Sequence, residues 1–511
     1  MFSTLNDDVI HLILKDIVDT TFITEYSNSE KTPRNPGRNL LPLSLACKAL
    51  REHCLPIIFR DLYSSRRGVA PKSLWKYVGV LHLRDRVPRG DESGAQQHID
   101  IDVYVDILQS FPALRRLALK IKSATLAEAI LLAASSVPTL DELAITATRW
   151  EGPQLSAFSR FTHLRSLTLS VGRWPHNTPY FYQEEEMYNV HAYLGLLASQ
   201  LSHLEISSDI CALSTLAEIS WPHLISLEMT GHNLPREQID VSTAVGRMPY
   251  LRALHMAIAA PCEGPWDQPP ALIYGSPSHN GSSPPSLPTI LPSLESLALS
   301  NVYATSDTIL DELPESLVSL RVLACYTVIR SRRPWTRFRW PRRYSLPEPV
   351  AYRVVHHTAR MSALTELVLA LDFLPTPELV RAIAKSCPQL TMLELEYTRY
   401  YEEFALPTQS PYLDSMRDKL SHLEGLQELH ISVADLTPTE AIFASSSNIV
   451  PRFLPFLESL ASSLPKLAKI WLTYNVESLV PTPVFWYKFL VEVDRAGKPY
   501  VRGEVVLEFR S

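Results

Sequence analysis

The sequence predicts an α/β fold, an irregular solenoid in which short parallel strands line one side and helices lie outside. Three observations lead to this prediction. A six-residue apolar pattern recurs along the chain, 75 of the 511 residues are leucine, and prolines stand at a fixed distance before many copies of the pattern. A chain of this length is too long for one compact core, whereas a repeat array grows by adding neighbouring units.

The repeating pattern is an apolar residue, two variable residues, an apolar residue, one variable residue and a last apolar residue. Its final apolar positions alternate with polar ones, which is the period of a short half-buried strand. After the first full match, successive matches begin 23 to 47 residues apart, so the longer intervals predict inserted loops. The matches begin at Leu114, Leu140, Leu164, Leu201, Leu224, Leu251, Leu294, Leu317, Leu364, Leu390, Leu426 and Leu467, with a weaker copy at Val78.

Segments between the matches have the features of helices that stop before each strand. In the segment 376–387, Thr376 is expected to cap a helix, Pro377 suits its first position and Glu378 complements its dipole. A proline two residues before the first leucine then turns the chain away from helical conformation. This arrangement occurs at Pro112, Pro138, Pro222, Pro249, Pro292, Pro388 and Pro465.

This order of strand, turn, helix and proline resembles the leucine-rich repeat, from about residue 78 to residue 472. The resemblance implies a solenoid with a parallel sheet. At the position where that repeat usually has asparagine or cysteine, only Cys325 and Asn475 match, so we expect an irregular arc. Inserts are predicted near residues 173–190, 261–288 and 328–350, and a last strand is predicted from Glu504 to Phe509.

The first 62 residues do not follow the repeat and predict a small helical module, which leaves residues 63–511 to the solenoid. Apolar residues at Leu5, Val9 and Ile13 are four positions apart, as on one face of a helix. A polar loop follows this first helix, and a second helix is then expected from about Leu41 to Glu52.

The N-terminal module has a recognisable order of residues. A leucine is followed by an acidic residue and valine, an isoleucine–leucine pair, a loop, a leucine–alanine–cysteine–lysine run and then proline, phenylalanine and arginine. This order resembles the F-box, although Asn6 stands where that family usually has proline and the loop is longer. The matching residues are Leu5, Asp8, Val9, Ile13, Leu14, Leu43, Leu45, Ala46, Cys47, Lys48, Pro56, Phe59 and Arg60.

An F-box followed by leucine-rich repeats is a recurrent architecture, notably in fungal F-box proteins. The resemblance implies a non-catalytic substrate receptor of a Skp–cullin–F-box ubiquitin ligase. In such a receptor the F-box docks a Skp-type adaptor, and through it a cullin, while the repeats hold a protein substrate that the sequence does not identify. The adaptor-binding residues that the resemblance implies are Leu5, Asp8, Val9, Ile13, Leu14, Leu43, Leu45, Cys47, Lys48, Pro56 and Phe59.

Two other interpretations stay open. The module can serve only as a cap, because the terminal repeat of a solenoid would otherwise expose an apolar face. The chain would then be a leucine-rich-repeat scaffold without a ligase link. An enzyme is the least favoured interpretation, since the sequence has no metalloprotease, P-loop, hydrolase or dinucleotide-binding motif. We expect no cofactor and no metal site, because the adjacent rings of His356 and His357 diverge on a helix or strand.

A segment between two repeats is a candidate for binding a partner. Residues 330–344 contain seven arginines and four aromatic residues, and arginine binds phosphate or carboxylate groups through two parallel hydrogen bonds. The alternative is that these arginines pair with acidic neighbours while the aromatic rings anchor the insert. The candidate residues are Arg332, Arg333, Trp335, Arg337, Arg339, Trp340, Arg342 and Arg343.

Charge and hydropathy restrict the possible partners. The formal net charge is −6, so we do not expect the chain as a whole to bind nucleic acid by bulk attraction. The N-terminus lacks the features of a signal peptide and no long uncharged apolar stretch is present, so we expect no membrane span. We therefore expect an intracellular protein of the cytoplasm, the nucleus or both. The three glutamates from Glu184 to Glu186 are predicted to lie in a solvated loop.

Overall fold

The computed structural model divides into two compact units, which are described separately below. Unit 1 consists of residues 1–229 and 247–250, and unit 2 consists of residues 230–246 and 251–511. The structure describes residues 14, 40–63, 71–84, 106–121, 124–147, 150, 155–171, 184–231, 241–258, 260–262, 287–300, 309–311, 313–329, 343–397, 409–432, 446–473, 486–493 and 499–504.

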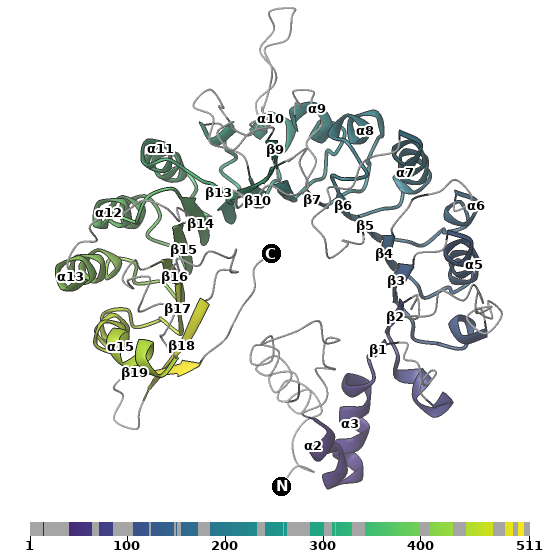
Figure 1. Cartoon of the computed structure of the whole chain (residues 1–511), viewed down its shortest axis with the longest axis horizontal. Helices are drawn as coiled ribbons and strands as arrows, with labels where there is room; N and C mark the ends of the chain where they lie inside the picture. Colours follow the sequence, from purple (N-terminus) through teal and green to yellow (C-terminus); the bar gives the residue numbers. More distant parts are fainter. Residues whose placement is uncertain are drawn as a thin grey trace, which may run out of the picture. The chain divides into compact units, whose positions relative to one another are not determined.

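Unit 1 combines the N-terminal helices with a sheet. Its elements are α2 (Leu41–Ala46), α3 (Lys48–Ile58), β1 (Asp61–Tyr63), η3 (Lys72–Tyr77), β2 (Val80–Arg84), β3 (Arg116–Ile121), α5 (Ala124–Ala134), β4 (Glu142–Ala147), α6 (Leu155–Phe158), β5 (Ser166–Val171), α7 (Glu184–Leu197), β6 (His203–Ser207), α8 (Leu213–Glu218) and β7 (Ser226–Gly231). Strands β1 to β7 are hydrogen bonded in chain order, and the pairs from β1 to β6 are parallel. Helices α5 to α8 cover one face of this sheet (Figure 1). We call the opposite face, which none of these four helices covers, the helix-free face of unit 1.

The leucines of the repeat pair with one another across unit 1. Leu117, Leu143, Leu167 and Leu204 are in register on β3 to β6, and each is almost completely buried. A second row of aliphatic residues, two positions further along the same strands, is aligned in the same way. Each such side chain contributes about 1.5–3 kcal/mol by burial. The repeats therefore share one continuous core.

Unit 2 contains the remaining repeats. Its elements are α9 (Val241–Val245), β8 (Ala253–Ile258), β9 (Ala260–Cys262), α10 (Leu287–Ile290), β10 (Ser296–Leu299), η5 (Ile309–Asp311), β11 (Ser319–Val322), β12 (Cys325–Ile329), β13 (Arg343–Tyr344), α11 (Glu348–Thr358), β14 (Glu366–Leu371), α12 (Pro377–Ser386), β15 (Met392–Tyr397), α13 (Gln409–Leu420), β16 (Glu428–Ser432), α15 (Ser446–Ser463), β17 (Lys469–Thr473), β18 (Trp486–Val493) and β19 (Pro499–Glu504).

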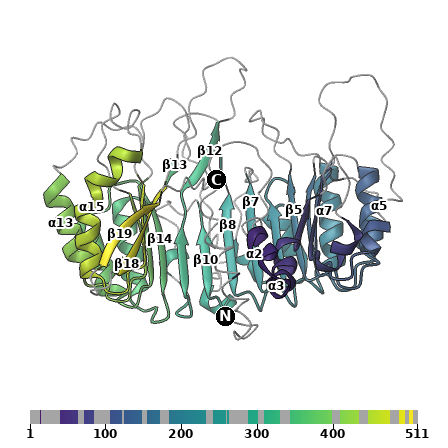
Figure 2. The same cartoon turned by 90° about the horizontal axis from the view of Figure 1, so that it is seen from below.

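The main sheet of unit 2 follows chain order as β8-β10-β11-β14-β15-β16-β17-β18-β19. Its strands are parallel up to β17, whereas β18 and β19 add an antiparallel hairpin. Strands β9, β12 and β13 form a separate small sheet. Figure 2 shows β8, β10 and β14 running along one direction. Parallel strands with helices on one face confirm the predicted α/β leucine-rich-repeat solenoid. A last strand was predicted from Glu504 to Phe509, and of these residues the structure describes only Glu504, the last residue of β19.

The proline stops and the helix cap have the predicted local structure. After Pro138 and Pro388 the chain makes a tight turn, in which Leu140 N donates to Val137 O and Leu390 N donates to Cys387 O. Helix α12 begins at Pro377, and the Thr376 hydroxyl accepts a hydrogen bond of 3.2 Å from Leu379 N. The Thr376 cap predicted from sequence is therefore confirmed.

The expected single helix from Leu41 to Glu52 is wrong, because the chain forms two helices there. Cys47 is extended, with φ −158° and ψ 165°, and this conformation ends α2. The Cys47 sulfur then caps α3 by accepting from Leu50 N at 3.5 Å. A sulfur that satisfies a backbone N–H stabilises the break, which apolar periodicity alone does not reveal.

The solvated loop predicted for three glutamates is also wrong. Glu184 begins helix α7, inside the interval in which an insert is predicted. Glu186 is only 4% exposed, and its Oε1 accepts from Trp150 N at 3.3 Å. Carboxylates favour the first turn of a helix because unpaired N–H groups give that end a partial positive charge.

Replacing Thr376 with alanine is expected to lower the free energy of unfolding by about 1 kcal/mol, because Leu379 N loses its acceptor. Urea denaturation monitored by circular dichroism measures this change. Thr376→Ser keeps the hydroxyl and is expected to retain most of the stability. Equal losses in both variants would contradict the capping role.

Candidate binding surfaces

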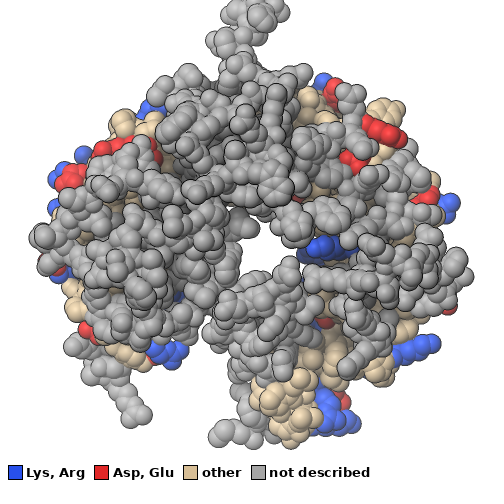
Figure 3. All heavy atoms as spheres, in the orientation of Figure 1, with Lys and Arg blue, Asp and Glu red and all other residues tan. Residues whose placement is uncertain are grey.

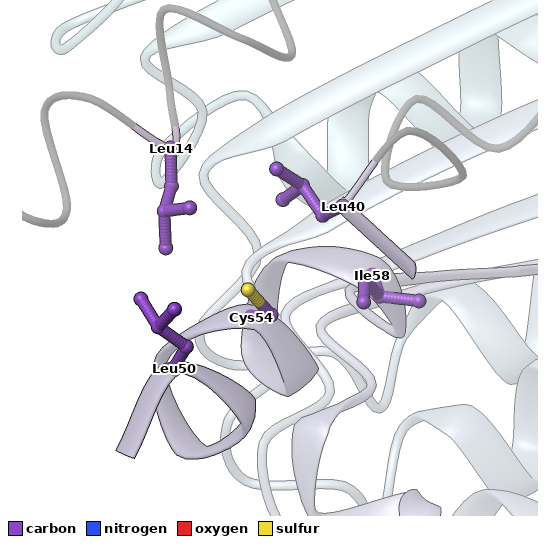
Figure 4. Close-up of a cluster of buried hydrophobic side chains, with 5 residues drawn as sticks. All are labelled: Leu14, Leu40, Leu50, Cys54 and Ile58. Carbon is purple, nitrogen blue, oxygen red and sulfur yellow. The ribbon is translucent and has the colours of Figure 1, made fainter. Parts of the chain in front are cut away.

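The N-terminal helices form a small module with a core of its own. Leu14, Leu40, Leu50, Cys54 and Ile58 are each at most 5% exposed and form one buried cluster. Their side chains converge between helix α3 and the neighbouring segments (Figure 4). Leu43 of α2 packs against this cluster, and three of the cluster's members lie on α3, so apolar burial holds α2 and α3 together.

The described adaptor-binding candidates are divided between the inside and the surface of this module. Leu14 lies in the core, and Leu43 and Phe59 pack against it while partly exposed. Leu45 is 73% exposed. The other exposed candidates are Cys47, Lys48 and Pro56, and the candidates outside the described residues are Leu5, Asp8, Val9 and Ile13. Adaptor contact stays a prediction for all of them.

Two cysteines of the module differ in their surroundings. Cys47 is exposed and Cys54 is fully buried, and both are free thiols. Burial raises the pKa of the Cys54 thiol, and a negative charge on Cys47 would raise it further. Cys54 therefore stays a neutral thiol at physiological pH and acts as an apolar member of the core.

The arginine-rich candidate segment lies almost entirely outside the described residues. Arg343, with Tyr344, forms strand β13, whose backbone pairs antiparallel with Tyr326 and Cys325 of β12. Its proposed role in partner binding stays a prediction. The adjacent rings of His356 and His357 lie at the end of α11, 6.0 Å apart and nearly perpendicular.

The helix-free face of unit 1 has a shallow polar depression of about 200 Å³ across strands β3 to β7. At one end, Arg116 and Glu142 form an ion pair of 3.6 Å. At the other end lie Glu205 and Glu228, and the Thr168 hydroxyl donates to Glu205 Oε2 at 3.0 Å. Figure 3 shows basic atoms on the side of unit 1 that faces away from its helices.

The two glutamates of the depression influence each other. Glu205 is exposed on β6, and Glu228 is half-buried on the neighbouring strand β7. Burial raises the pKa of Glu228 above its ordinary value of 4.5, and the negative charge of Glu205 raises it further. At neutral pH the ionised carboxylate of Glu228 is therefore unfavourable to the fold.

In unit 2, side chains of β15 and β16 form a polar network on the face of the sheet opposite helices α12 and α13. His430 is 1% exposed and lies between two carboxylates. Its Nδ1 is 3.4 Å from Glu394 Oε2, and its Nε2 is 2.8 Å from Glu428 Oε1. Buried polar groups of this kind are stable only when they are paired.

Strands β17 and β18 complete this network. Trp471 Nε1 donates to Glu428 Oε1 at 2.9 Å, and Lys469 Nζ donates to Glu428 Oε2 at 3.3 Å. The Trp471 ring stacks on His430, and Lys488 Nζ lies 5.7 Å from the Trp471 ring centroid. Burial by itself raises the pKa of Glu428, but the hydrogen bonds and charges of His430 and Lys469 outweigh it and lower the pKa to about 2.

The residues of these two strand faces carry no distinctive sequence motif. They occupy variable positions of the six-residue pattern, where polar residues are expected and no single copy is distinctive. The signal that could reveal them is the charge of the residue at the fifth position of the six-residue pattern, compared between neighbouring copies. That comparison brings Glu205 next to Glu228 and Glu394 next to His430, although each pair is far apart in the chain.

In the part of the chain that the structure describes, no group of three or more His, Cys, Asp or Glu side chains is arranged to hold a metal ion. Likewise, none of the described helices is both long enough and apolar enough to cross a bilayer.

Comparisons with known proteins find similar structures only. No protein-family model matches the chain, and no curated protein sequence does. A chain of the yeast Rad7–Elc1 complex is 16% identical with a TM-score of 0.39, and the match covers 83% of this chain and 88% of that one. An internalin of Listeria monocytogenes is 12% identical with a TM-score of 0.33, and the match covers 88% of this chain and 89% of that one. A leucine-rich-repeat protein of Leptospira interrogans is 14% identical with a TM-score of 0.31, and the match covers 80% of this chain and 75% of that one. Because these scores are low, the solenoid assignment rests on the strand order and registers.

Replacing Glu428 with glutamine is expected to destabilise unit 2 at neutral pH. A carboxylate with a pKa of about 2 in the folded state stabilises the fold above its ordinary value of 4.5, and this contribution is lost as the pH falls to about 2. Urea denaturation at several pH values is expected to show that the free energy of unfolding is lower in the variant at neutral pH. This difference from wild type is expected to shrink as the pH falls from 4.5 to about 2. Glu424→Gln, on an exposed residue before the same strand, is the control, and a pH-independent difference would contradict the assignment.

Replacing Glu228 with glutamine is expected to have the opposite effect and to stabilise the fold at neutral pH. A raised folded-state pKa means that the ionised carboxylate favours unfolding, so its removal relieves that cost. The gain is expected to disappear as the pH falls below the ordinary value of 4.5, where both states are protonated. Melting temperatures of the variant and of wild type, measured across this pH range, test whether the substitution stabilises the fold. A lower melting temperature of the variant at neutral pH would refute this prediction.

Proposed function

We propose that this protein is a non-catalytic substrate receptor of a Skp–cullin–F-box ubiquitin ligase. The observation that supports this proposal most is the 73% exposure of Leu45 on a helical module whose interior is already filled. Leu41, on the same helix α2, is 43% exposed, and Cys47 follows at its end. The module thus presents apolar side chains outward, in the segment that resembles the F-box.

This arrangement suits docking into the groove of a partner. In such interfaces a few desolvated apolar side chains provide most of the binding free energy, and the surrounding polar residues exclude water. Leu45 fits the role of a central anchor, while Lys48 and Pro56 lie on exposed positions of α3. We propose a Skp-type adaptor as the partner, with a cullin bound through it, in the cytoplasm, the nucleus or both.

The solenoid is proposed to hold the protein substrate. A leucine-rich-repeat scaffold presents a row of variable side chains at fixed spacing along its strands. The receptor would work by proximity, because holding a target raises the effective concentration of its lysines near the charged conjugating enzyme. The receptor itself takes part in no bond-making step.

A scaffold without a ligase link is the second candidate. Strand β1 follows α3 closely and pairs in parallel with β2, and both Gly79 N and Val80 N donate to Arg60 O. The module is therefore continuous with the first repeat and is placed to cap its end. A cap alone needs no exposed leucine, so substitution of Leu45 distinguishes the ligase receptor from the scaffold.

Co-purification with a Skp-type adaptor tests the proposal. The full chain is expected to recover the adaptor, and Leu45→Asp is expected to lower the recovery at least about tenfold, because an apolar anchor becomes a charge. A point variant is preferable to deletion of residues 1–62, because the deletion would also remove part of β1.

Val493→Asp is the matched control, since Val493 is 66% exposed on β18 and belongs to no part of the module. It is expected to leave adaptor recovery unchanged. If the folded full chain recovers no adaptor, or if Leu45→Asp recovers as much as wild type, the receptor proposal fails and the scaffold candidate is favoured.

A further inference from the structure

Four consecutive turns of unit 1 form an edge that carries positive charge only. Three of these turns lead from helices into strands β5, β6 and β7, and the fourth is the last segment of the unit. Together they contain three arginines and two histidines but no aspartate or glutamate. We call them the basic edge, which consists of residues 159–165, 198–202, 219–225 and 247–250.

Backbone hydrogen bonds hold these turns side by side. Ser202 N donates to Arg165 O at 2.8 Å, and Ile225 N donates to Ser202 O at 2.8 Å. Trp221 N donates to Arg247 O at 3.0 Å, which joins the third turn to the fourth. Because neighbouring strands are about 4.8 Å apart, the basic edge is about 15 Å long, the span of about five residues of an extended chain.

The three arginines of the basic edge are exposed and available to a partner. Arg160, Arg165 and Arg247 make no side-chain hydrogen bond or ion pair with the part of the chain that the structure describes. Asp141, in the turn before Arg165, is already bound by Arg115 at 2.6 Å. An arginine without an internal partner can bind a carboxylate through two parallel hydrogen bonds.

Two exposed apolar side chains lie at one end of the same edge. Tyr250 is 63% exposed and Ile225 is 39% exposed, and they belong to the two turns that the hydrogen bond between Trp221 and Arg247 joins. Tyrosine and arginine are enriched in protein–protein interfaces, where the tyrosine ring provides apolar contact. This apolar pair is independent of the charge, and it indicates a protein partner.

The corresponding turns of unit 2 have different chemistry. They contain three glutamates, Glu295, Glu315 and Glu424, against two cations, Arg360 and Lys466. The lack of acidic residues is therefore a property of the unit 1 edge and not of the repeat. Nucleic acid is less favoured than an acidic peptide, because the net charge of −6 opposes a long polyanion, whereas a short segment confines its charge to the edge.

We propose that the basic edge of unit 1 binds an acidic segment of a partner protein. Aspartate or glutamate side chains of that segment bind the three arginines, and an apolar side chain packs on Tyr250 and Ile225. The proposal goes beyond the proposed function, because it holds whether or not the N-terminal module docks an adaptor.

Binding of defined peptide pools to the full chain tests this surface. The probes are short fluorescent peptides with several glutamates and one leucine at varied positions, and matched pools with glutamine or lysine in place of glutamate. In fluorescence anisotropy at low salt, the glutamate pool is expected to bind about tenfold more tightly than the glutamine pool, and high salt is expected to reduce this preference. The lysine pool is expected to bind least.

Charge variants then locate the binding site. The test variant replaces the three exposed arginines of the basic edge, as Arg160→Gln/Arg165→Gln/Arg247→Gln, and is expected to abolish the preference for glutamate. The control variant removes the same charge from three exposed cations of unit 2, as Arg381→Gln/Lys385→Gln/Lys466→Gln, and is expected to keep the preference. Melting temperatures show that each variant is folded.

Tyr250 variants test the apolar contact separately. Tyr250→Ser is expected to weaken binding of the glutamate pool at least about threefold and to leave its salt dependence unchanged, because the charges remain. Tyr250→Phe keeps the ring and is expected to bind as wild type does. Equal affinity of wild type and Tyr250→Ser would contradict the proposed apolar contact.

The outcomes separate this inference from nucleic-acid binding and from the ligase proposal. If wild type binds the glutamate and glutamine pools equally, or if the arginine variant keeps the preference, the peptide site is refuted. Tighter binding of a single-stranded oligothymidylate than of the glutamate pool, lost in the arginine variant, would also refute it in favour of nucleic acid. Adaptor recovery by the arginine variant is expected to equal that of wild type, and adaptor failure with intact glutamate preference refutes only the ligase proposal.

Discussion

The alignment of leucines across neighbouring parallel strands is the constraint on which the rest of the molecule depends. Leu117, Leu143, Leu167 and Leu204 are buried only because each lies in register with the next. A shift of one residue would turn these side chains to the other face of the sheet and bring polar ones into the core. The core therefore fixes the register, and the register decides which polar side chains become neighbours on the helix-free face.

The same register has different consequences in the two units. In unit 2 the face of β15 and β16 is buried, so its charged side chains must be paired to be tolerated. Buried Glu394 and His430 meet that requirement by contact with each other, and His430 also contacts half-buried Glu428. Lys469 and Trp471 of β17 donate to Glu428. In unit 1 the outward positions of β4 and β5 are half-exposed, so solvent reaches the polar side chains there.

The repeat pattern predicts strands β2 to β8, β10, β11 and β14 to β17, but not β1 or the hairpin of β18 and β19. Proline and capping residues predict the turns and the Thr376 cap, because each depends on residues adjacent in sequence. Local signals fail at Cys47, where a sulfur cap breaks a segment that looks like one helix, and at Glu186, whose burial depends on the Trp150 backbone. The strand-face residues were missed for a related reason. Glu205 meets its neighbour on β7 only through the sheet, and the six-residue pattern specifies no residue type at that position.

The contrast between two glutamates shows how the surroundings of a carboxylate decide its effect on stability. Glu428 has a depressed pKa because the fold supplies cationic and donor groups around it, so its charge strengthens the structure. Glu228 has a raised pKa because it is half-buried beside Glu205, so its charge weakens the structure. A serine or threonine at the Glu228 position would keep the strand and remove the repulsion. The sign of a carboxylate's contribution to stability therefore follows from the groups that the sheet register places beside it.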